Sequence, residues 1–321
     1  MKKIFKNSLF FLLPFLLLLV LIVVISKSVL RNGNYFSINT NNTILVLGHS
    51  QNECALNDSL ISNVVNFSQG GESYFYTYLK LKKMLQANPQ INTVILSFTN
   101  NQIDKAMDKW IWGDASMQNY YPKYSFMMSR EDYLVLANNN LSSLIKSESN
   151  ATNYFFNFMI KKNKNYYKDR YCGGYLYLER NKIDSLLKTN YLKENAKINY
   201  TLLSKTNIDY CKKIVNLCNE NNIKIFFIRV PAHKLMPFYK NEILYKKIKK
   251  QEFPTVTLLD FKDYPTKNSE LGDFGHLNHI GATKFSLFLN KLMLKNFLQN
   301  KNPQMIINKE ILNLKEEQQI N

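Results

Sequence analysis

Cysteine and histidine are both scarce in this chain of 321 residues, which has four of each. None of the cysteines forms a CxxC pair, which argues against zinc knuckles and thioredoxin-type redox sites. Cys211 and Cys218 share one face of a predicted helix and lie about 10 Å apart along it, too far for a disulfide bond. We expect both to be small buried hydrophobic residues. A disulfide between Cys54 and Cys172 remains open.

Acidic residues are also few. Lys and Arg number 42 against 24 Asp and Glu, so the formal net charge is +18. A charge of this size points to an acidic partner, such as anionic lipid head groups, an anionic glycan or nucleic acid. The basic residues are scattered along the chain and no nucleic-acid-binding motif accompanies them. We therefore expect no nucleic-acid partner.

The N-terminal segment has the apolar run of a leader but lacks a cleavage site. The uncharged run from Leu9 to Ile25 reaches roughly 25 Å at about 1.5 Å per residue, the short end of a membrane span. No small-x-small site such as Ala-x-Ala follows, and no lipid-accepting cysteine. We expect an uncleaved anchor over residues 1–30 and a polar linker over 31–42. A cleaved signal peptide is the alternative.

The charges around this run predict its orientation. Lysines stand at positions 2, 3 and 6, before the apolar segment. Positively charged flanks stay on the cytoplasmic side of a membrane. The sequence therefore predicts a single-pass protein of the cytoplasmic membrane, with its N-terminus inside and the remaining chain extracytoplasmic.

Alternating strand and helix patterns follow the linker. Short apolar runs that end at glycine or polar residues predict buried parallel strands over 43–50, 62–71, 92–101, 223–231 and 255–261. Apolar residues at helical spacing predict helices over 72–89, 200–222 and 279–298, and residues 233–251 form a basic helical or mixed segment. This order predicts one α/β domain over 43–300 with a central parallel sheet.

Two parts of the chain fall outside this alternation. Residues 102–198 are rich in Tyr, Asn and Lys, and we expect a mostly helical insertion that covers one end of the sheet. It could serve as a lid, a partner surface or a packing appendage. The tail over 301–321 is polar, and we expect it to be loosely held.

Ligands of a parallel sheet bind beyond the carboxyl ends of its strands, so the residues after each strand are the candidates for a site. Ser50 follows the first strand, and "DFGH" after the last strand supplies Asp273 and His276. An acid three residues before a histidine can hold one ring nitrogen while the other faces a serine. We expect Ser50 as nucleophile, His276 as its base and Asp273 as the orienting acid.

Acyl transfer at a serine also needs hydrogen-bond donors for the oxyanion. The backbone N–H of Ser50 is one candidate, and that of Gly70 or Gly71, after the second strand, is another. The side-chain amide of Asn100 or Asn101, after the third strand, would complete the set.

The other three histidines are not expected to take part in catalysis. His49 is expected to be a hydrogen-bonding residue at the strand end, and His233 is a second candidate for the cleft. His279 falls in the first turn of a helix that Asn278 caps, where packing is expected. Three nitrogen ligands would suit zinc, but His49, His276 and His279 show no HxxxH spacing. We therefore expect no metal and no cofactor.

Four motifs together resemble a known family. "LVLGHS", "NFSQGG", "TNN" and "DFGHLN" look like the four blocks of the SGNH (GDSL-type) hydrolase superfamily, in their usual order. The resemblance covers about 43–101 and 200–298. It is strongest to membrane-anchored branches, such as the teichoic acid D-alanine transfer and alginate O-acetylation proteins. One departure is that the family's Gly-Asp-Ser is Gly-His-Ser here.

The resemblance implies a three-layer α/β/α flavodoxin-like fold with a Ser-His-Asp site and ester or O-acyl chemistry, often on carbohydrates. By block, it places the same roles on Ser50, Gly70 or Gly71, Asn100 or Asn101, Asp273 and His276. We therefore expect a serine esterase or O-acyltransferase acting on acylated cell-surface or secreted polysaccharide or another ester, with a membrane acyltransferase as a further partner. The alternatives are an inactive glycan-binding or assembly subunit of the same fold, and a lipase- or thioesterase-like hydrolase.

Overall fold

The computed structural model of this chain describes residues 2–32, 36–161, 173–189, 191 and 202–320. These residues form two compact units. The first joins Met1–Ser37 to Trp112–Tyr171, and the second joins Ile38–Ile111 to Cys172–Asn321. All the residues predicted for the catalytic site lie in the second unit.

The first unit is helical where it is described. It contains α1 (Lys2–Asn32), α5 (Asp114–Tyr124), the 3-10 turn η3 (Ser125–Met127) and α6 (Arg130–Lys161), whose backbone is non-helical at Asn140. The last turns of α1 are tied to the other helices. Lys27 pairs with Glu148 of α6 at 2.9 Å, and Arg31 donates to the carbonyl oxygen of Phe126. Part of the predicted insertion thus packs on the end of α1.

Helix α1 contains a span from Leu12 to Arg31 with a mean hydropathy of 2.7, of which 6% is buried. Its length and composition suit a membrane anchor or a signal sequence. This agrees with the predicted apolar segment, although the helix continues to Asn32, beyond the predicted end at residue 30.

The second unit is built on a five-stranded, all-parallel sheet in the order β2-β1-β3-β4-β5. The strands are β1 (Ile44–Leu47), β2 (Val64–Asn66), β3 (Thr93–Ser97), β4 (Lys224–Arg229) and β5 (Thr257–Asp260). Each lies inside the range predicted for it, so the α/β prediction with a central parallel sheet is confirmed. Because the strands are parallel, the residues after each strand gather at one edge.

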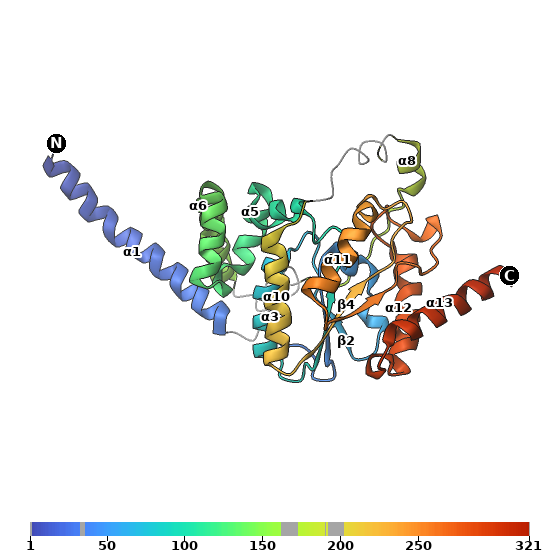
Figure 1. The fold of residues 1–321 in the computed structure, drawn as a ribbon. Coiled ribbons are helices and arrows are strands. Elements are labelled where there is room, and N and C mark those ends of the chain that lie inside the picture. Colours follow the sequence, from blue (N-terminus) through green and yellow to red (C-terminus); the bar gives the residue numbers. More distant parts are fainter. Residues whose placement is uncertain (1, 33–35, 162–172, 190, 192–201, 321) are drawn as a thin grey trace. The chain divides into compact units, whose positions relative to one another are not determined.

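Helices cover both faces of this sheet. Figure 1 shows α3 (Tyr74–Ala87) and α10 (Lys205–Glu220) side by side on one side and α12 (His279–Leu294) on the other. The remaining elements of the unit are α2 (Ser50–Ala55), η1 (Asp58–Leu60), η2 (Lys105–Met107), α4 (Asp108–Trp112), α8 (Ile183–Lys188), η4 (Pro237–Asn241), α11 (Glu242–Glu252), η5 (Asn268–Glu270), η6 (Phe297–Gln299) and α13 (Pro303–Ile320).

The apolar side chains of β4 alternate between the two faces, as in any strand. Ile228 belongs to the buried cluster that α12 completes with Phe285 and Leu289. Phe227 belongs to the opposite face and stacks on Phe98 with ring centroids 4.4 Å apart. Apolar side chains therefore pack on both faces of the sheet, and the site is built at its carboxyl edge.

The prediction of a loosely held polar tail over 301–321 is wrong. Residues 303–320 form helix α13, with Ile307 and Ile311 buried one turn apart. Gln304 covers the outer edge of β5, because its amide donates to the carbonyl oxygen of Asp260 and accepts from the N–H of the same residue. The backbone N–H and C=O of Asp260, on the outer strand of the sheet, thereby have hydrogen-bond partners. The prediction failed because polar residues outnumber apolar ones in this segment, although its buried apolar residues share one face of the helix.

Replacing Ile307 with Ala should lower the free energy of unfolding by about 2–4 kcal/mol, because buried methyl groups are lost and a cavity remains. Met305 is the matched control, since it lies on the same helix and is 64% exposed. Met305→Ala should change stability by less than about 0.5 kcal/mol. Urea-induced unfolding of both variants measures the difference. Two equally small losses would mean that α13 does not pack on the domain.

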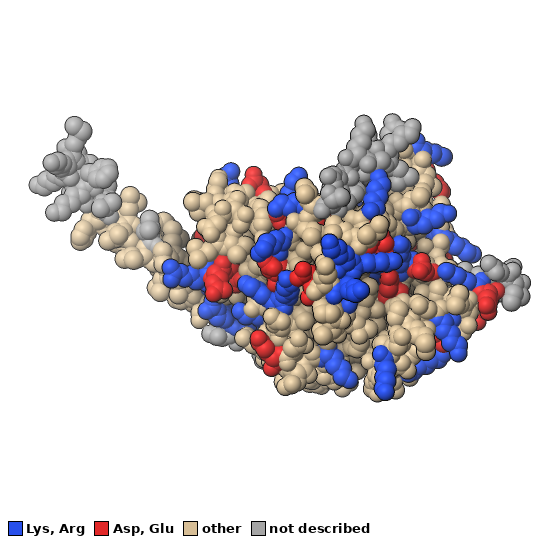
Figure 2. All heavy atoms as spheres, viewed as in Figure 1, with Lys and Arg blue, Asp and Glu red and all other residues tan. Residues whose placement is uncertain are grey.

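The predicted insertion over 102–198 divides between the units. Its first residues and the described residues 173–189 and 191 belong to the second unit, and residues 112–161 belong to the first. Residues 180, 182, 186 and 191 line the candidate site. Cys54, Cys211 and Cys218 are buried and free, as expected for the helical pair, whereas Cys172 lies outside the described residues. Figure 2 shows basic side chains spread over the visible face rather than gathered in one patch.

Candidate active site

A tight turn after strand β1 places Ser50 at the start of helix α2. Gly48, directly after the strand, has φ +148°, and a Cβ on it would stand 2.2 Å from Cβ of Ser97. Only glycine fits there. The turn places His49 as the N-cap of α2 and Ser50 as its first residue, at the carboxyl edge of the sheet.

The three residues predicted as a triad lie together. Nε2 of His276 is 2.8 Å from Oγ of Ser50, and Nδ1 of His276 is 2.7 Å from Oδ1 of Asp273. The Gly275 N–H donates to the same Asp273 oxygen at 2.8 Å. A carboxylate can only accept, so Nδ1 carries the ring proton and Nε2 is left to accept from the serine hydroxyl.

Asp273 is held as an anion. Burial alone would raise the pKa of its carboxyl group, but hydrogen bonds from His276, the Gly275 N–H and Arg180 outweigh that effect and lower the pKa to about 2. The Arg180 guanidinium forms an ion pair with the other carboxylate oxygen. The acid can therefore orient the imidazole without competing for its proton.

Arg180 is a residue that the sequence analysis missed. It comes from the stretch 173–182, which the chain brings to the site from within the predicted insertion, 93 residues before Asp273. Neither a motif nor a strand end marks it. With Lys182 it adds positive charge to the cavity beside the triad.

The loop after β2 brings Gly70 beside the serine. A Cβ on Gly70 would lie 3.7 Å from Cβ of Ser50 and 2.9 Å from Oε2 of Glu53. Glu53 stands one turn after Ser50 and accepts the Gly70 N–H, while burial, the larger effect, raises the pKa of its carboxyl group to about 7. One predicted oxyanion donor is thus engaged by a neighbouring acid. Gly71 has φ +71°, a backbone conformation suited to glycine.

The structure distinguishes the two candidate asparagines. Asn100 is 2% exposed, and its amide donates to Asn241 and Glu242 while its oxygen accepts from Arg229. Both of its amide hydrogens are used, so the prediction that Asn100 could bind an oxyanion does not hold. Asn101 lines the same cavity as Ser50 and His276 and is the remaining candidate.

The other three histidines do not converge with His276 on a common point. His49 is buried and contacts Thr99, and His279 stacks on Tyr177 with ring centroids 4.6 Å apart. His279 is therefore a packing residue of the helix that Asn278 caps, as predicted. Among the described residues, no group of three or more His, Cys, Asp or Glu could hold a metal ion.

His233 does not line the cavity beside the triad. Its ring lies behind Phe274, with centroids 5.0 Å apart, and its Nδ1 accepts from the Leu235 N–H. The prediction that His233 lines the cleft is therefore wrong, whereas His49, the other candidate, does belong to the lining. The aromatic ring of Phe274, which the sequence analysis did not single out, takes that place in the wall.

The cavity beside the triad has a volume of about 360 Å³. This volume lies in the range of small-molecule sites, roughly 300–1,000 Å³. Its lining combines the triad and Asn101 with two cations and an apolar wall; the wall comprises Leu186, Tyr191, Met236, Phe238 and Phe274, and the cations are Arg180 and Lys182.

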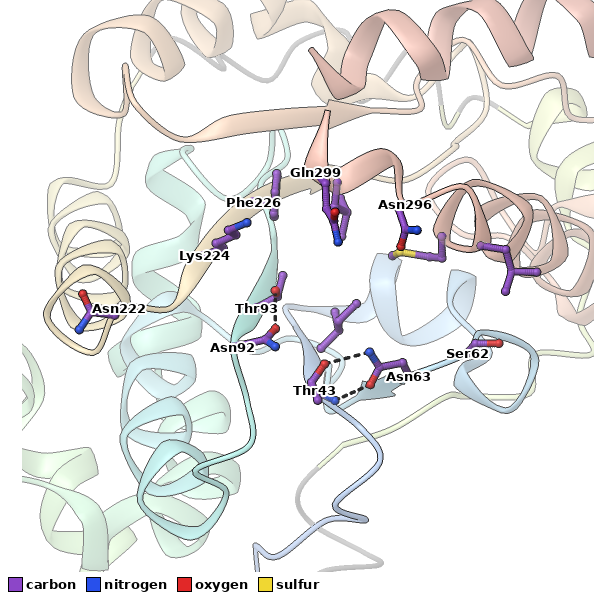
Figure 3. Close-up of a pocket in the computed structure, with 14 residues that line it drawn as sticks. Thr43, Ser62, Asn63, Asn92, Thr93, Asn222, Lys224, Phe226, Asn296 and Gln299 are labelled. Atoms are coloured by element: carbon purple, nitrogen blue, oxygen red, sulfur yellow. Dashed lines mark hydrogen bonds between the residues drawn. The ribbon is translucent and has the colours of Figure 1, made fainter. Parts of the chain in front are cut away.

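A larger cavity of about 540 Å³ lies at the opposite, amino end of the strands (Figure 3). Asn63, Asn222 and Asn296 in its lining have φ values of 64°, 56° and 53°, the left-handed conformation that asparagine tolerates in turns. Thr43 and Asn63, which lie side by side in its wall, are joined by two hydrogen bonds. Among the described residues of its lining there is neither a histidine nor a carboxylate, and the ionisable side chain in it is Lys224.

The contacts at the carboxyl edge match those that nucleophilic catalysis requires. A histidine lies within hydrogen-bond reach of a serine, and a carboxylate contacts the other nitrogen of that histidine. In a comparison with known protein families, the sequence model of an uncharacterised family matches residues 34–298, a range that includes this whole site. No curated protein matches the chain.

Proposed function

We propose that the chain, which belongs to this uncharacterised family, is a serine esterase or O-acyltransferase that works through Ser50, His276 and Asp273. The observation that carries the proposal is the unbroken hydrogen-bonded series from Ser50 Oγ through both nitrogens of His276 to Asp273, with distances of 2.8 and 2.7 Å. Its three members come from positions 50, 273 and 276, and two separate loops must meet to form it.

The reaction follows from these contacts. His276 Nε2 takes the hydroxyl proton as Ser50 Oγ bonds to the ester carbonyl carbon, whose oxygen becomes an oxyanion. Collapse of this intermediate breaks the bond to the alkoxy group, which leaves with the proton from His276. Water or a sugar hydroxyl then attacks the acyl-serine, gives its proton to His276, and releases Ser50 in its starting state. Asp273 stabilises the imidazolium at both stages.

The resemblance to SGNH hydrolases supports this proposal through the fold as well. The strand order β2-β1-β3-β4-β5 is that of flavodoxin-like sheets, which place ligands at the carboxyl edge. Helices on both faces agree with a three-layer α/β/α arrangement. We infer that the substrate is an acylated polysaccharide or another ester.

We place the domain outside the cytoplasmic membrane. In this proposal α1 remains as a single-pass anchor with its N-terminal lysines inside. The positive cavity wall and the net charge of +18 favour an anionic glycan or the membrane face as the surroundings of the substrate.

One observation favours a second candidate function. The Gly70 N–H is bound by Glu53, and an acid so placed would oppose an oxyanion. The domain would then be an inactive glycan-binding or assembly subunit that has kept the fold.

A fluorophosphonate probe separates the two functions, because it reacts only with an activated serine. We expect the full-length protein in detergent to be labelled, with the adduct mapped by mass spectrometry to Ser50 and absent from Ser50→Ala. Ser59→Ala, at an exposed serine nine residues away, should label normally. A folded protein that is not labelled at Ser50 would overturn the enzymatic proposal and favour the inactive subunit.

A further inference from the structure

A chain of polar side chains joins His49 to Asn101, and both of these residues line the cavity beside the triad. Nε2 of His49 is 2.9 Å from Oγ1 of Thr99, and the Thr99 hydroxyl is 2.6 Å from Oδ1 of Asn101. His49 and Thr99 are 4% and 3% exposed, so both are shielded from solvent. Asn101 stands at the end of the chain, where it lines the cavity with Ser50.

One backbone group and the nearer of two acceptors set the direction of the hydrogens in this chain. The Gln51 N–H can only donate, and it donates to Nδ1 of His49. Nε2 therefore carries the ring proton and donates to Thr99. The hydrogen of the Thr99 hydroxyl goes to Oδ1 of Asn101 at 2.6 Å, because the other acceptor, Oε1 of Gln102, is 3.4 Å away and already accepts from Tyr74. The Nδ2 donors of Asn101 are then turned away from Thr99.

We propose that His49 and Thr99 are positioning residues that fix the amide of Asn101, so that Nδ2 rather than Oδ1 faces the oxyanion formed at Ser50. The inference rests on the proposed function. It adds that hydrogen bonds from outside the triad hold one oxyanion donor, the Asn101 amide, in a fixed orientation. An amide turned the other way would place a carbonyl oxygen against the developing negative charge.

The charge state of His49 agrees with this role. Burial, together with the positive charge that His276 acquires, lowers the pKa of His49 to about 3. His49 therefore stays neutral, with one donor and one acceptor, when His276 takes the serine proton. A doubly protonated His49 could not accept from Gln51.

An acid at position 49 would reverse these hydrogen bonds. The Thr99 contact is made by Nε2 of His49, and a Glu or Gln side chain is long enough to reach that position, whereas Asp or Asn is not. An ionised Glu can only accept from Thr99, and Thr99 would then accept from Asn101, with Oδ1 of the amide turned toward the cavity. A Gln can donate to Thr99, so it keeps the present direction. Glu and Gln have nearly the same size, and the pair isolates hydrogen direction.

The test is a double-mutant cycle on the rate constant of fluorophosphonate labelling in the full-length protein. Asn101→Ala should slow labelling by about 10²-fold or more, as for loss of one oxyanion donor. Thr99→Val should slow it by about 10- to 100-fold, and Thr99→Ser, which keeps the hydroxyl, should restore most of the rate. On the Asn101→Ala background, Thr99→Val should cause no further loss.

The isosteric pair gives a second readout. His49→Glu should label at least about tenfold more slowly than His49→Gln, at equal thermal stability. A merely structural role for His49 would not distinguish the two.

Each failure has a distinct appearance. If Thr99→Val slows labelling as much on the Asn101→Ala background as on the native one, Thr99 does not act through Asn101 and the inference is overturned. Equal rates for native protein and Thr99→Val overturn it as well. If the native protein itself is not labelled at Ser50, the proposed function fails, and the positioning role fails with it.

Discussion

Asp273→Asn should slow fluorophosphonate labelling by roughly 10³- to 10⁴-fold while the protein stays folded. An asparagine amide can donate to Nδ1 of His276, and the ring proton then moves to Nε2. In that tautomer Nε2 faces Ser50 as a donor and cannot take the serine proton. The negative charge that stabilises the imidazolium is lost at the same time.

Arg180→Gln provides the control for this result. Both variants break the Arg180–Asp273 ion pair, but only Asp273→Asn changes the partner of His276. The Arg180 side chain is 44% exposed, so its pairing should matter little, and labelling should fall by less than about tenfold. Rates for Asp273→Asn within tenfold of the native protein would show that Asp273 does not orient His276, and would favour the inactive subunit.

The parts of the site that could be predicted are those carried by short motifs at strand ends. Ser50 follows the end of β1 by three positions, and Asp273 and His276 share one loop, so local spacing was enough to bring the acid to the base. Parallel strands then place both segments at one edge. The contact between Ser50 and His276, 226 residues apart, follows from that topology.

The parts that could not be predicted depend on where distant segments return. Arg180 reaches Asp273 from a stretch without recognisable strand or helix signals. Asn100 and Asn101 differ in their hydrogen-bond partners, which come from other parts of the chain or from the neighbouring Thr99. Arg229 and Glu242 engage the first, while Thr99 holds the oxygen of the second. Adjacent residues of one type look identical in a sequence, and only the surrounding donors and acceptors distinguish them.

Helix α13 was missed for a different reason. Its polar composition suggested a loose tail, but a helix needs only one apolar stripe to pack. Ile307 and Ile311 supply that stripe, and Gln304 completes it with hydrogen bonds to β5. Composition averages over all faces of a helix and therefore conceals the buried one.

Lys80→Met should lower the free energy of unfolding by about 3–5 kcal/mol, the cost of leaving one member of a buried ion pair without its partner. Lys80 and Glu72 are 2.7 Å apart with both side chains 0% exposed, and Lys80 also donates to the Phe67 carbonyl oxygen. The loop that carries Gly70 is thus held at both ends by one ammonium group.

Two further variants show whether this loss comes from the uncompensated charge. Adding Glu72→Gln to Lys80→Met should recover a large part of the stability, because no buried charge is then left alone. Lys205→Met breaks the exposed pair with Asp209, where Lys205 is 91% exposed, and should cost no more than about 0.5 kcal/mol. Denaturant unfolding of the three variants checks these values. If the double variant were no more stable than Lys80→Met, the loss would come from the Phe67 contact and the packing of the lysine stem. The loop beside Ser50 would then owe its position to the lysine alone, with no requirement for the acid.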